Sequence, residues 1–251
     1  MARIISAERS ILPACDVRRI DDFQKIVKAT APVDEVAGYK VGYSLGLRYG
    51  LPEVVKIVRD LAPGKKVIYD HQKAGTDIPD QGAEFADTMA MAGVDAAILF
   101  PQAGPATQEE FIRALQNRRV GVIVGGEMTH PEYLEPDGGY IAETAPEQMY
   151  RLGVRKGVRS FVVPGNKPTK VAQYRAIIEE ECNGDEFELM SPGLIKQGGR
   201  IEDTTKTAGK NWHVIVGRGI FDPLNTGDPS SVSTEQMRAT TLELASMFRG
   251  K

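Results

Sequence analysis

Four charged residues of alternating sign lie close to two short apolar runs of the chain. Lys40 lies within one run, and Asp70, Lys73 and Asp77 follow the next. If these side chains converge, each ammonium keeps its carboxylate neighbours ionised, and each carboxylate keeps the ammoniums charged. Preorganised charge of this kind can stabilise a developing anion, so we interpret the four residues as a candidate catalytic array. A structural salt-bridge network is the alternative interpretation.

A second group of residues, nearer the C-terminus, has the composition of an anion site. Gly198 and Gly199 follow one apolar run, and Arg218 stands between two glycines after the next run. Glycine lets the backbone approach an anion closely because it has no Cβ, and a guanidinium offers a fork of donors. The two loops together therefore predict a phosphate site. Alternatively, the glycines only form a turn and Arg218 pairs with a surface carboxylate.

The elements that must position these residues are eight short, nearly continuous apolar runs. Such runs are typical of strands that are covered on both faces. They lie at residues 11–15, 36–41, 66–69, 96–99, 120–124, 160–163, 187–190 and 213–216. Pro13 weakens the first, since proline donates no ladder hydrogen bond. His213, at the start of the last run, is expected to be a packing residue.

Amphipathic segments separate the apolar runs, as crossover helices would. They lie at residues 20–29, 52–61, 81–92, 107–115, 146–152, 170–181, 200–208 and 234–248. Alternation of this kind predicts parallel strands, and eight repeats favour a closed (β/α)8 barrel over an open doubly wound sheet. No linker divides the chain, so we expect residues 1–251 to form one barrel domain. The irregular stretch at residues 131–139 is interpreted as an insertion over the barrel mouth.

Composition narrows the class of function. The chain has 251 residues, of which 41% are hydrophobic and 26% charged, as expected of a globular protein with a core. Its formal charge of −3 argues against a general nucleic-acid or membrane surface. Cys15 and Cys182 have no metal-ligand spacing and are expected to be buried thiols. With no signal-peptide or membrane-spanning pattern, we expect a cytoplasmic protein.

Polar motifs at the predicted strand ends resemble, in order along nearly the whole chain, those of the orotidine 5′-phosphate decarboxylase family. The motifs are Ala14-Cys15-Asp16-Val17, Gly38-Tyr39-Lys40-Val41-Gly42, the stretch from Asp70 to Pro79, Glu127-Met128-Thr129-His130-Pro131, Ser191-Pro192-Gly193 with Gln197-Gly198-Gly199, and Val216-Gly217-Arg218. The resemblance implies a (β/α)8 barrel that decarboxylates orotidine 5′-phosphate to uridine 5′-phosphate in pyrimidine biosynthesis. It also implies that neither a metal nor an organic cofactor is needed.

The resemblance further implies a role for each member of the charged array. Lys73 would donate the proton, with Asp70 beside the carboxylate of the substrate. Lys40 would bridge the ribose and the array. Asp77 would reach into the neighbouring subunit's site, so the resemblance implies a homodimer.

The remaining roles that the resemblance implies concern binding of the nucleotide. Asp16 would hydrogen-bond the ribose. Thr129, where the family usually has serine, would contact the pyrimidine, and Pro192 would pack near the ring. The phosphate would be held by Gln197, Gly217 and Arg218.

The stretch from Asp70 to Asp77 departs from the family's pattern of Asp-x-Lys-x-x-Asp-Ile-Pro, because each gap contains one extra residue. On a continuing strand, Asp70 and Lys73 would face opposite sides, since side chains alternate. We therefore expect the chain to leave strand geometry after Asp70, with Gly75 permitting a bulge. A second departure is Glu132, where the family commonly has glycine.

Two other functions fit parts of the pattern. One is a related Mg²⁺-dependent phosphosugar aldolase or decarboxylase, whose metal would need carboxylate ligands. Lys40 and the segment from Met128 to Pro131 argue against it. The other is a catalytically inactive barrel that binds nucleotides, which the altered spacing between Asp70 and Asp77 would favour.

Overall fold

Strands form where the apolar runs predict them. The computed structural model describes residues 2–70 and 74–247, and within these it contains eight strands, each within two residues of its predicted bounds. They are β1 (Arg9–Pro13), β2 (Gly38–Gly42), β3 (Lys66–Asp70), β4 (Ala96–Leu99), β5 (Gly121–Gly125), β6 (Ser160–Val162), β7 (Glu188–Ser191) and β8 (Trp212–Val216). Pro13 is the last residue of β1, a position where a missing donor is tolerated.

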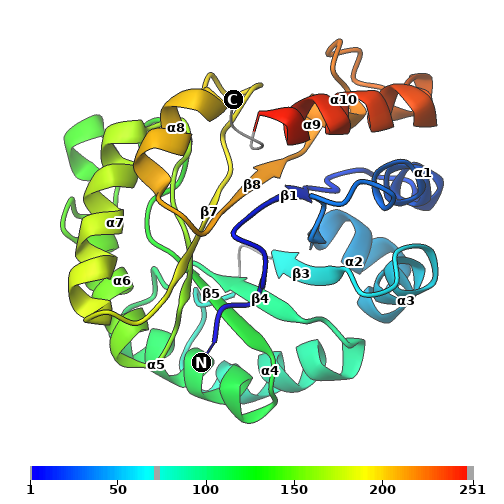
Figure 1. Cartoon of the computed structure of the whole chain (residues 1–251). Helices are drawn as coiled ribbons and strands as arrows, with labels where there is room; N and C mark the ends of the chain where they lie inside the picture. Colours follow the sequence, from blue (N-terminus) through cyan, green and yellow to red (C-terminus); the bar gives the residue numbers. More distant parts are fainter. Residues whose placement is uncertain (1, 71–73, 248–251) are drawn as a thin grey trace.

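All strand pairs are parallel, and the sheet closes on itself (Figure 1). The order of the strands is β1-β8-β7-β6-β5-β4-β3-β2. Backbone hydrogen bonds then join β1 to the β2 segment, where Ile11 N donates to Glu35 O at 2.8 Å and Cys15 N donates to Lys40 O at 2.8 Å. The predicted (β/α)8 barrel is therefore confirmed.

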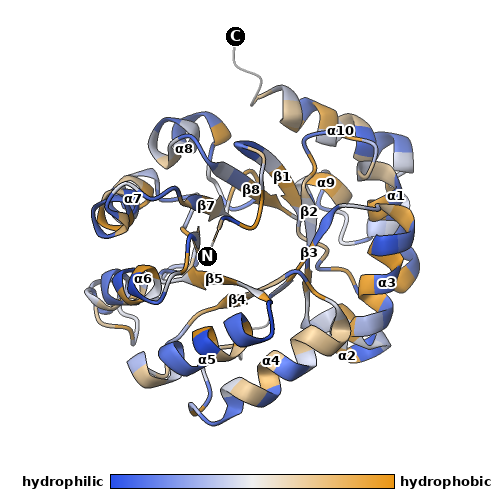
Figure 2. Ribbon diagram, turned by 60° about the horizontal axis from the view of Figure 1, so that its bottom comes forward, coloured by the Kyte–Doolittle hydropathy of each residue, from blue (hydrophilic) through white to orange (hydrophobic). Residues whose placement is uncertain are grey.

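Helices surround the strands on the outside, as Figure 2 shows in a view into the ring. The predicted helices are present as α1 (Ile20–Thr30), α3 (Leu51–Leu61), α4 (Gln81–Ala92), α5 (Pro105–Asn117), α6 (Ala145–Arg155), α7 (Pro168–Cys182), α8 (Ile201–Ala208) and α10 (Thr234–Ser246). The predicted end of the last helix, Phe248, lies outside the described residues. None of the helices in the described part of the chain is long and apolar enough to cross a membrane.

Four short elements were not predicted: α2 (Tyr43–Tyr49), α9 (Arg218–Phe221) and the one-turn 3₁₀ helices η1 (Glu135–Asp137) and η2 (Pro229–Ser231). Helix α2 gives no periodic signal because it has little buried face. Tyr43 is 58% exposed and Leu47 is 75% exposed. Gly50 then takes a φ of 79° and separates α2 from α3, which glycine does without steric cost.

The core has two layers, because successive side chains of a strand point to opposite faces. In β1, Ile11 packs outward against the helices, whereas Leu12 points into the barrel. In β8, likewise, Val214 packs outward against the helices and Ile215 points into the barrel. Cys15 and Cys182, expected to be buried thiols, are both buried and free.

The loop at residues 131–139 is tied to the end of β5. The Tyr133 hydroxyl donates to Gly126 O at 3.0 Å and accepts from Gln102 Nε2 at 3.0 Å. Both Tyr133 and Leu134 are buried, so the loop is packed against the barrel at its C-terminal rim. Glu132 takes a φ of 56°, a left-handed conformation that glycine adopts more easily.

A buried polar network closes the opposite end of the barrel. Glu188, which has no exposed surface, accepts hydrogen bonds from Ile4 N at 2.7 Å and Ser160 Oγ at 2.5 Å. His213 Nε2 lies 3.0 Å from the same carboxylate, and its Nδ1 lies 2.8 Å from Ser10 Oγ. His213 is fully buried, as expected of a packing residue, and it also hydrogen-bonds within this network. Alternation along β8 turns it inward, where a polar side chain needs partners.

We predict that Glu188→Gln lowers the free energy of unfolding by about 2–3 kcal/mol, because several charge-assisted hydrogen bonds weaken in a buried site. Urea denaturation followed by circular dichroism measures the change. An unchanged midpoint would show that the network contributes little to stability.

Candidate active site

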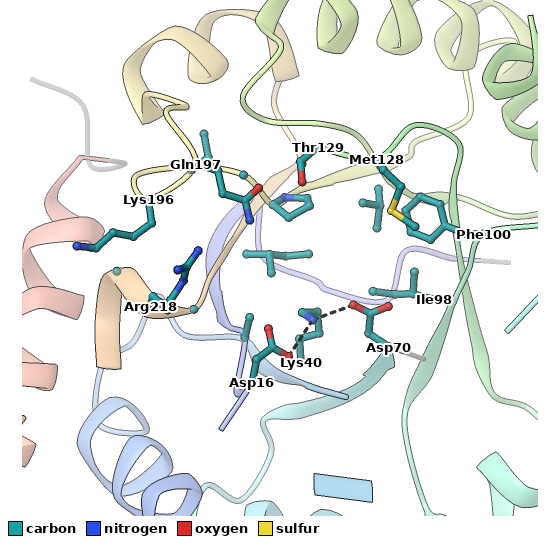
Figure 3. A pocket seen from close by; sticks show the side chains of 18 of the residues that line it. Asp16, Lys40, Asp70, Ile98, Phe100, Met128, Thr129, Lys196, Gln197 and Arg218 are labelled. Carbon is teal, nitrogen blue, oxygen red and sulfur yellow. Dashed lines mark hydrogen bonds and ion pairs between the residues drawn. The ribbon is translucent and has the colours of Figure 1, made fainter. Parts of the chain in front are cut away.

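A cavity of about 460 Å³ opens at the C-terminal ends of the strands (Figure 3). Barrels of this kind gather side chains there because all parallel strands end on the same face. Eight of the ten predicted site residues line the cavity: Asp16, Lys40, Asp70, Thr129, Pro192, Gln197, Gly217 and Arg218. Asp77 does not line it, and Lys73 lies outside the described residues.

Lys40 is the centre of a row of charges from three neighbouring strands. Its Nζ lies 2.8 Å from Asp70 Oδ2 and 3.5 Å from Asp16 Oδ1. Burial alone would lower the pKa of the ammonium, but Asp70 and Asp16 outweigh this and raise the pKa above its usual value. Lys40 is therefore charged throughout the neutral range, although only 9% of it is exposed.

The described part of β3 ends at Asp70, and the departure from strand geometry expected after it falls on residues 71–73, which lie outside the described residues. Gly75 takes a φ of 78°, and the neighbouring Ala74 O accepts a hydrogen bond from Phe100 N at 3.2 Å. Gly75 therefore has the left-handed backbone conformation that the expected bulge could use, and the bulge itself stays a prediction. Beyond Gly75, Asp77 Oδ1 accepts from Ile78 N at 2.8 Å, and Asp77 O accepts from Thr107 Oγ1 at 2.8 Å.

The loops that follow β7 and β8 provide donors on another side of the cavity. Figure 3 shows Gln197 and Arg218 on one side, with Lys40 and Asp70 toward the other. Among the described residues, no carboxylate lies within ion-pair distance of Arg218. The alternative in which Arg218 pairs with a surface carboxylate is therefore not supported, and its guanidinium remains available to an anion.

The wall between these two groups is largely apolar. Ile98, Phe100, Met128, Val162 and Ile215 line it. A flat, uncharged part of a ligand would pack against this apolar wall.

Glycine is required where this wall is tightest. A Cβ at Gly125 would lie 2.3 Å from the Phe100 ring. A Cβ at Gly193 would lie 2.8 Å from Thr129 Cγ2, and Gly193 also takes a φ of 90°. The loop after β7 thus packs directly on the loop that carries Thr129.

Two charged residues that line the cavity were not predicted as site residues. Lys196 lines it and donates to Pro223 O at 2.5 Å. Glu127 also lines it and pairs with Lys167 at 2.6 Å. The one available signal was Glu127 itself, a charged residue directly after an apolar strand.

The arrangement suits a ligand with an anionic group at one end and polar groups at the other. In the described part of the chain, no cluster of three or more His, Cys, Asp or Glu side chains could hold a metal ion. Both carboxylates of the charged row already face the ammonium of Lys40.

Fold and site together define a (β/α)8 barrel with a candidate anion site at the ends of its seventh and eighth strands. Residues 10–230 match the model of the orotidine 5′-phosphate decarboxylase / HUMPS family. The chain belongs to this family.

Curated relatives and solved structures agree with this family assignment. The chain is 31% identical over 226 residues to orotidine 5′-phosphate decarboxylase from Methanosarcina mazei, covering 90% of this chain and 94% of the relative. It is 34% identical over 206 residues to the Methanosarcina barkeri enzyme, covering 80% and 84%. The Methanocaldococcus jannaschii enzyme, solved with the inhibitor BMP, superposes with a TM-score of 0.76 at 27% identity, covering 94% of this chain and 98% of that one.

We predict that Gly193→Ala destabilises the protein by about 2 kcal/mol more than Gly198→Ala. Both glycines have positive φ, but a Cβ at Gly198 would meet no atom within 4 Å. Comparing the two variants therefore separates the steric conflict with Thr129 from the cost of placing alanine at a positive φ. Urea denaturation of both variants measures the difference, and equal losses would contradict the packing described here.

Proposed function

We propose that this protein is a carboxy-lyase that converts orotidine 5′-phosphate to uridine 5′-phosphate and CO2 in pyrimidine biosynthesis, without a metal or organic cofactor. The observation that carries the proposal is the row Asp16–Lys40–Asp70, set in the same cavity as the guanidinium of Arg218, which has no ion-pair partner among the described residues. Family membership and relatives with this activity, aligned over most of the chain, support it.

The cavity offers a partner for each part of the nucleotide. Gln197, Gly217 and Arg218 would hold the phosphate, because a guanidinium and amide donors suit its oxygens. Asp16 and Lys40 would bind the ribose hydroxyls. Thr129 and Pro192 would contact the pyrimidine.

The reaction breaks the bond between C6 and the carboxylate carbon. The electron pair stays on C6, CO2 leaves, and C6 then takes a proton from the ammonium of Lys73. The ring carbonyls cannot delocalise this in-plane carbanion directly, so stabilisation comes from charge fixed in advance. Asp70 would keep the ammonium of Lys73 charged and oriented, as it does for Lys40.

The two other functions have less support. A Mg²⁺-dependent phosphosugar enzyme needs carboxylates free to bind the metal. Asp16 and Asp70 instead face the ammonium of Lys40, which would repel a divalent cation. For an inactive nucleotide-binding barrel, the altered spacing between Asp70 and Asp77 is the sole argument.

We further propose a cytoplasmic homodimer in which Asp77 completes the neighbouring subunit's site. Asp77 lies outside the cavity of its own chain, next to Ile78, which is 58% exposed. Tyr43 and Leu47 are exposed on α2, which follows β2, the strand that pairs with β3. Apolar side chains at this rim would be covered by a second subunit.

Purified protein should decarboxylate orotidine 5′-phosphate, and a chelator should not change the rate. Loss of substrate absorbance in the ultraviolet measures turnover. Lys73→Ala should reduce kcat by at least about 10³-fold, since the proton donor is lost, while uridine 5′-phosphate still binds. Turnover that survives in Lys73→Ala, or that chelation abolishes, would refute the assignment.

Mixing two inactive variants tests the shared site. In a hybrid dimer of Lys73→Ala and Asp77→Ala, one site carries both lesions and the other carries neither. Random reassociation should therefore restore about a quarter of wild-type activity. Light scattering verifies the dimer, and a mixture that stays inactive although hybrids form would show that Asp77 acts within its own chain.

A further inference from the structure

Glu127 is a buried carboxylate at the wall of the cavity. It follows β5 by two positions, is 2% exposed and lines the cavity. Its Oε1 lies 2.6 Å from Lys167 Nζ, and its Oε2 accepts a hydrogen bond from the hydroxyl of Tyr174. Both oxygens therefore have partners, which a buried carboxylate needs because loss of water is costly.

Tyr174 is suited to its part in this cluster. Burial, and after it the hydrogen bond to Glu127, raise the pKa of the phenol above its usual range. The hydroxyl therefore keeps its proton and donates a hydrogen bond to the Glu127 carboxylate. Its ring also packs against Tyr150, with the ring centres 5.0 Å apart.

The loop between β6 and α7 holds three successive residues of the loop after β5. Lys167 Nζ, besides pairing with Glu127, lies 3.4 Å from Met128 O. Next to it, Asn166 Nδ2 donates to Thr129 O at 3.0 Å. The backbone that carries Met128 and Thr129 is thus tied to the neighbouring strand's loop at each residue.

These ties act on the part of the cavity that would receive the ring. Met128 and Thr129 both line the cavity, and they follow Glu127 directly. Groups that bind a reacting ring must be held closely, since a displacement of about 1 Å can reduce the rate about 100-fold. A charged pair that is largely buried holds its loop more firmly than apolar contact alone, because breaking it leaves uncompensated charge in a buried site.

We propose that Glu127 and Lys167 form a positioning pair that holds Met128 and Thr129 against the pyrimidine ring. The proposal rests on the proposed function. Neither residue takes part in bond breaking. Their effect is on the ring end of the ligand, and the phosphate end, formed by other loops, should be insensitive to them.

The test compares two ligands that share the ribose phosphate and differ in the ring. Dissociation constants for uridine 5′-phosphate and ribose 5-phosphate are measured by calorimetry for the wild type, Glu127→Gln and Lys167→Met. Both variants should bind uridine 5′-phosphate about tenfold more weakly, with ribose 5-phosphate changed less than about twofold. Their kcat/KM for orotidine 5′-phosphate should fall by at least as much as uridine 5′-phosphate affinity.

Glu188→Gln is the matched control, because it removes an equally buried carboxylate at the far end of the barrel. It should lower stability and leave the ratio of the two dissociation constants unchanged. The double variant Glu127→Gln/Lys167→Met, which restores charge balance, should recover stability relative to the single variants but not affinity for uridine 5′-phosphate.

Three results would overturn the proposal: equal weakening of both ligands in Glu127→Gln, the same selective loss in Glu188→Gln, or recovery of uridine 5′-phosphate affinity in the double variant. The binding ratio does not depend on turnover. A wild type that fails to decarboxylate while Glu127→Gln still loses ring affinity would refute the proposed function and support the positioning pair.

Discussion

The hydrogen bonds that join β1 to the β2 segment bring Asp16 beside Lys40, and the rest of the site follows from that closure. Cys15 N bonds to Lys40 O, so the next residue, Asp16, lies alongside the ammonium. Pairing of β2 with β3 brings Asp70 to the other side. An ammonium this buried stays charged only because two carboxylates face it. Closure of the barrel is therefore needed to keep Lys40 charged, because it brings Asp16 beside the ammonium.

Both ends of the barrel contain polar clusters, but only one of the two clusters borders a cavity. At one end the row around Lys40 borders a cavity, and at the other Glu188 is enclosed by backbone amides, Ser160 and His213. Apolar side chains such as Leu12 and Ile215 fill the space between. The closed end stabilises the barrel without reaching the cavity, which leaves the open end free to carry groups that favour binding over stability.

Most of the site was predictable because of a property of parallel barrels. Every strand ends on the same face, so knowing that Asp16, Asp70 and Thr129 follow strands was enough to group them. Apolar runs located the strands to within two residues. Helix α2 was not predicted because its Leu47 side chain is exposed, so the sequence shows no stripe of buried apolar residues there.

What the sequence could not supply is the pairing of side chains between loops. Glu127 and Lys167 are 40 residues apart and follow different strands, and no periodic pattern connects them. His213 was expected to be a packing residue, and its hydrogen bond to Glu188 was not predicted. Its polar partner becomes visible only when β7 and β8 are placed side by side.

Closure of the barrel also sets the order in which the protein can fold. Ile4 N bonds to Glu188 across 184 residues of sequence, and β1 pairs with β8. During synthesis the first strand therefore emerges long before β8 and Glu188 exist, although the β2 segment follows soon after it. Contacts so distant in sequence form slowly. The edge of β1 that pairs with β8 stays unpaired until β8 has been synthesised, and an unpaired strand edge in a nascent chain is exposed to aggregation.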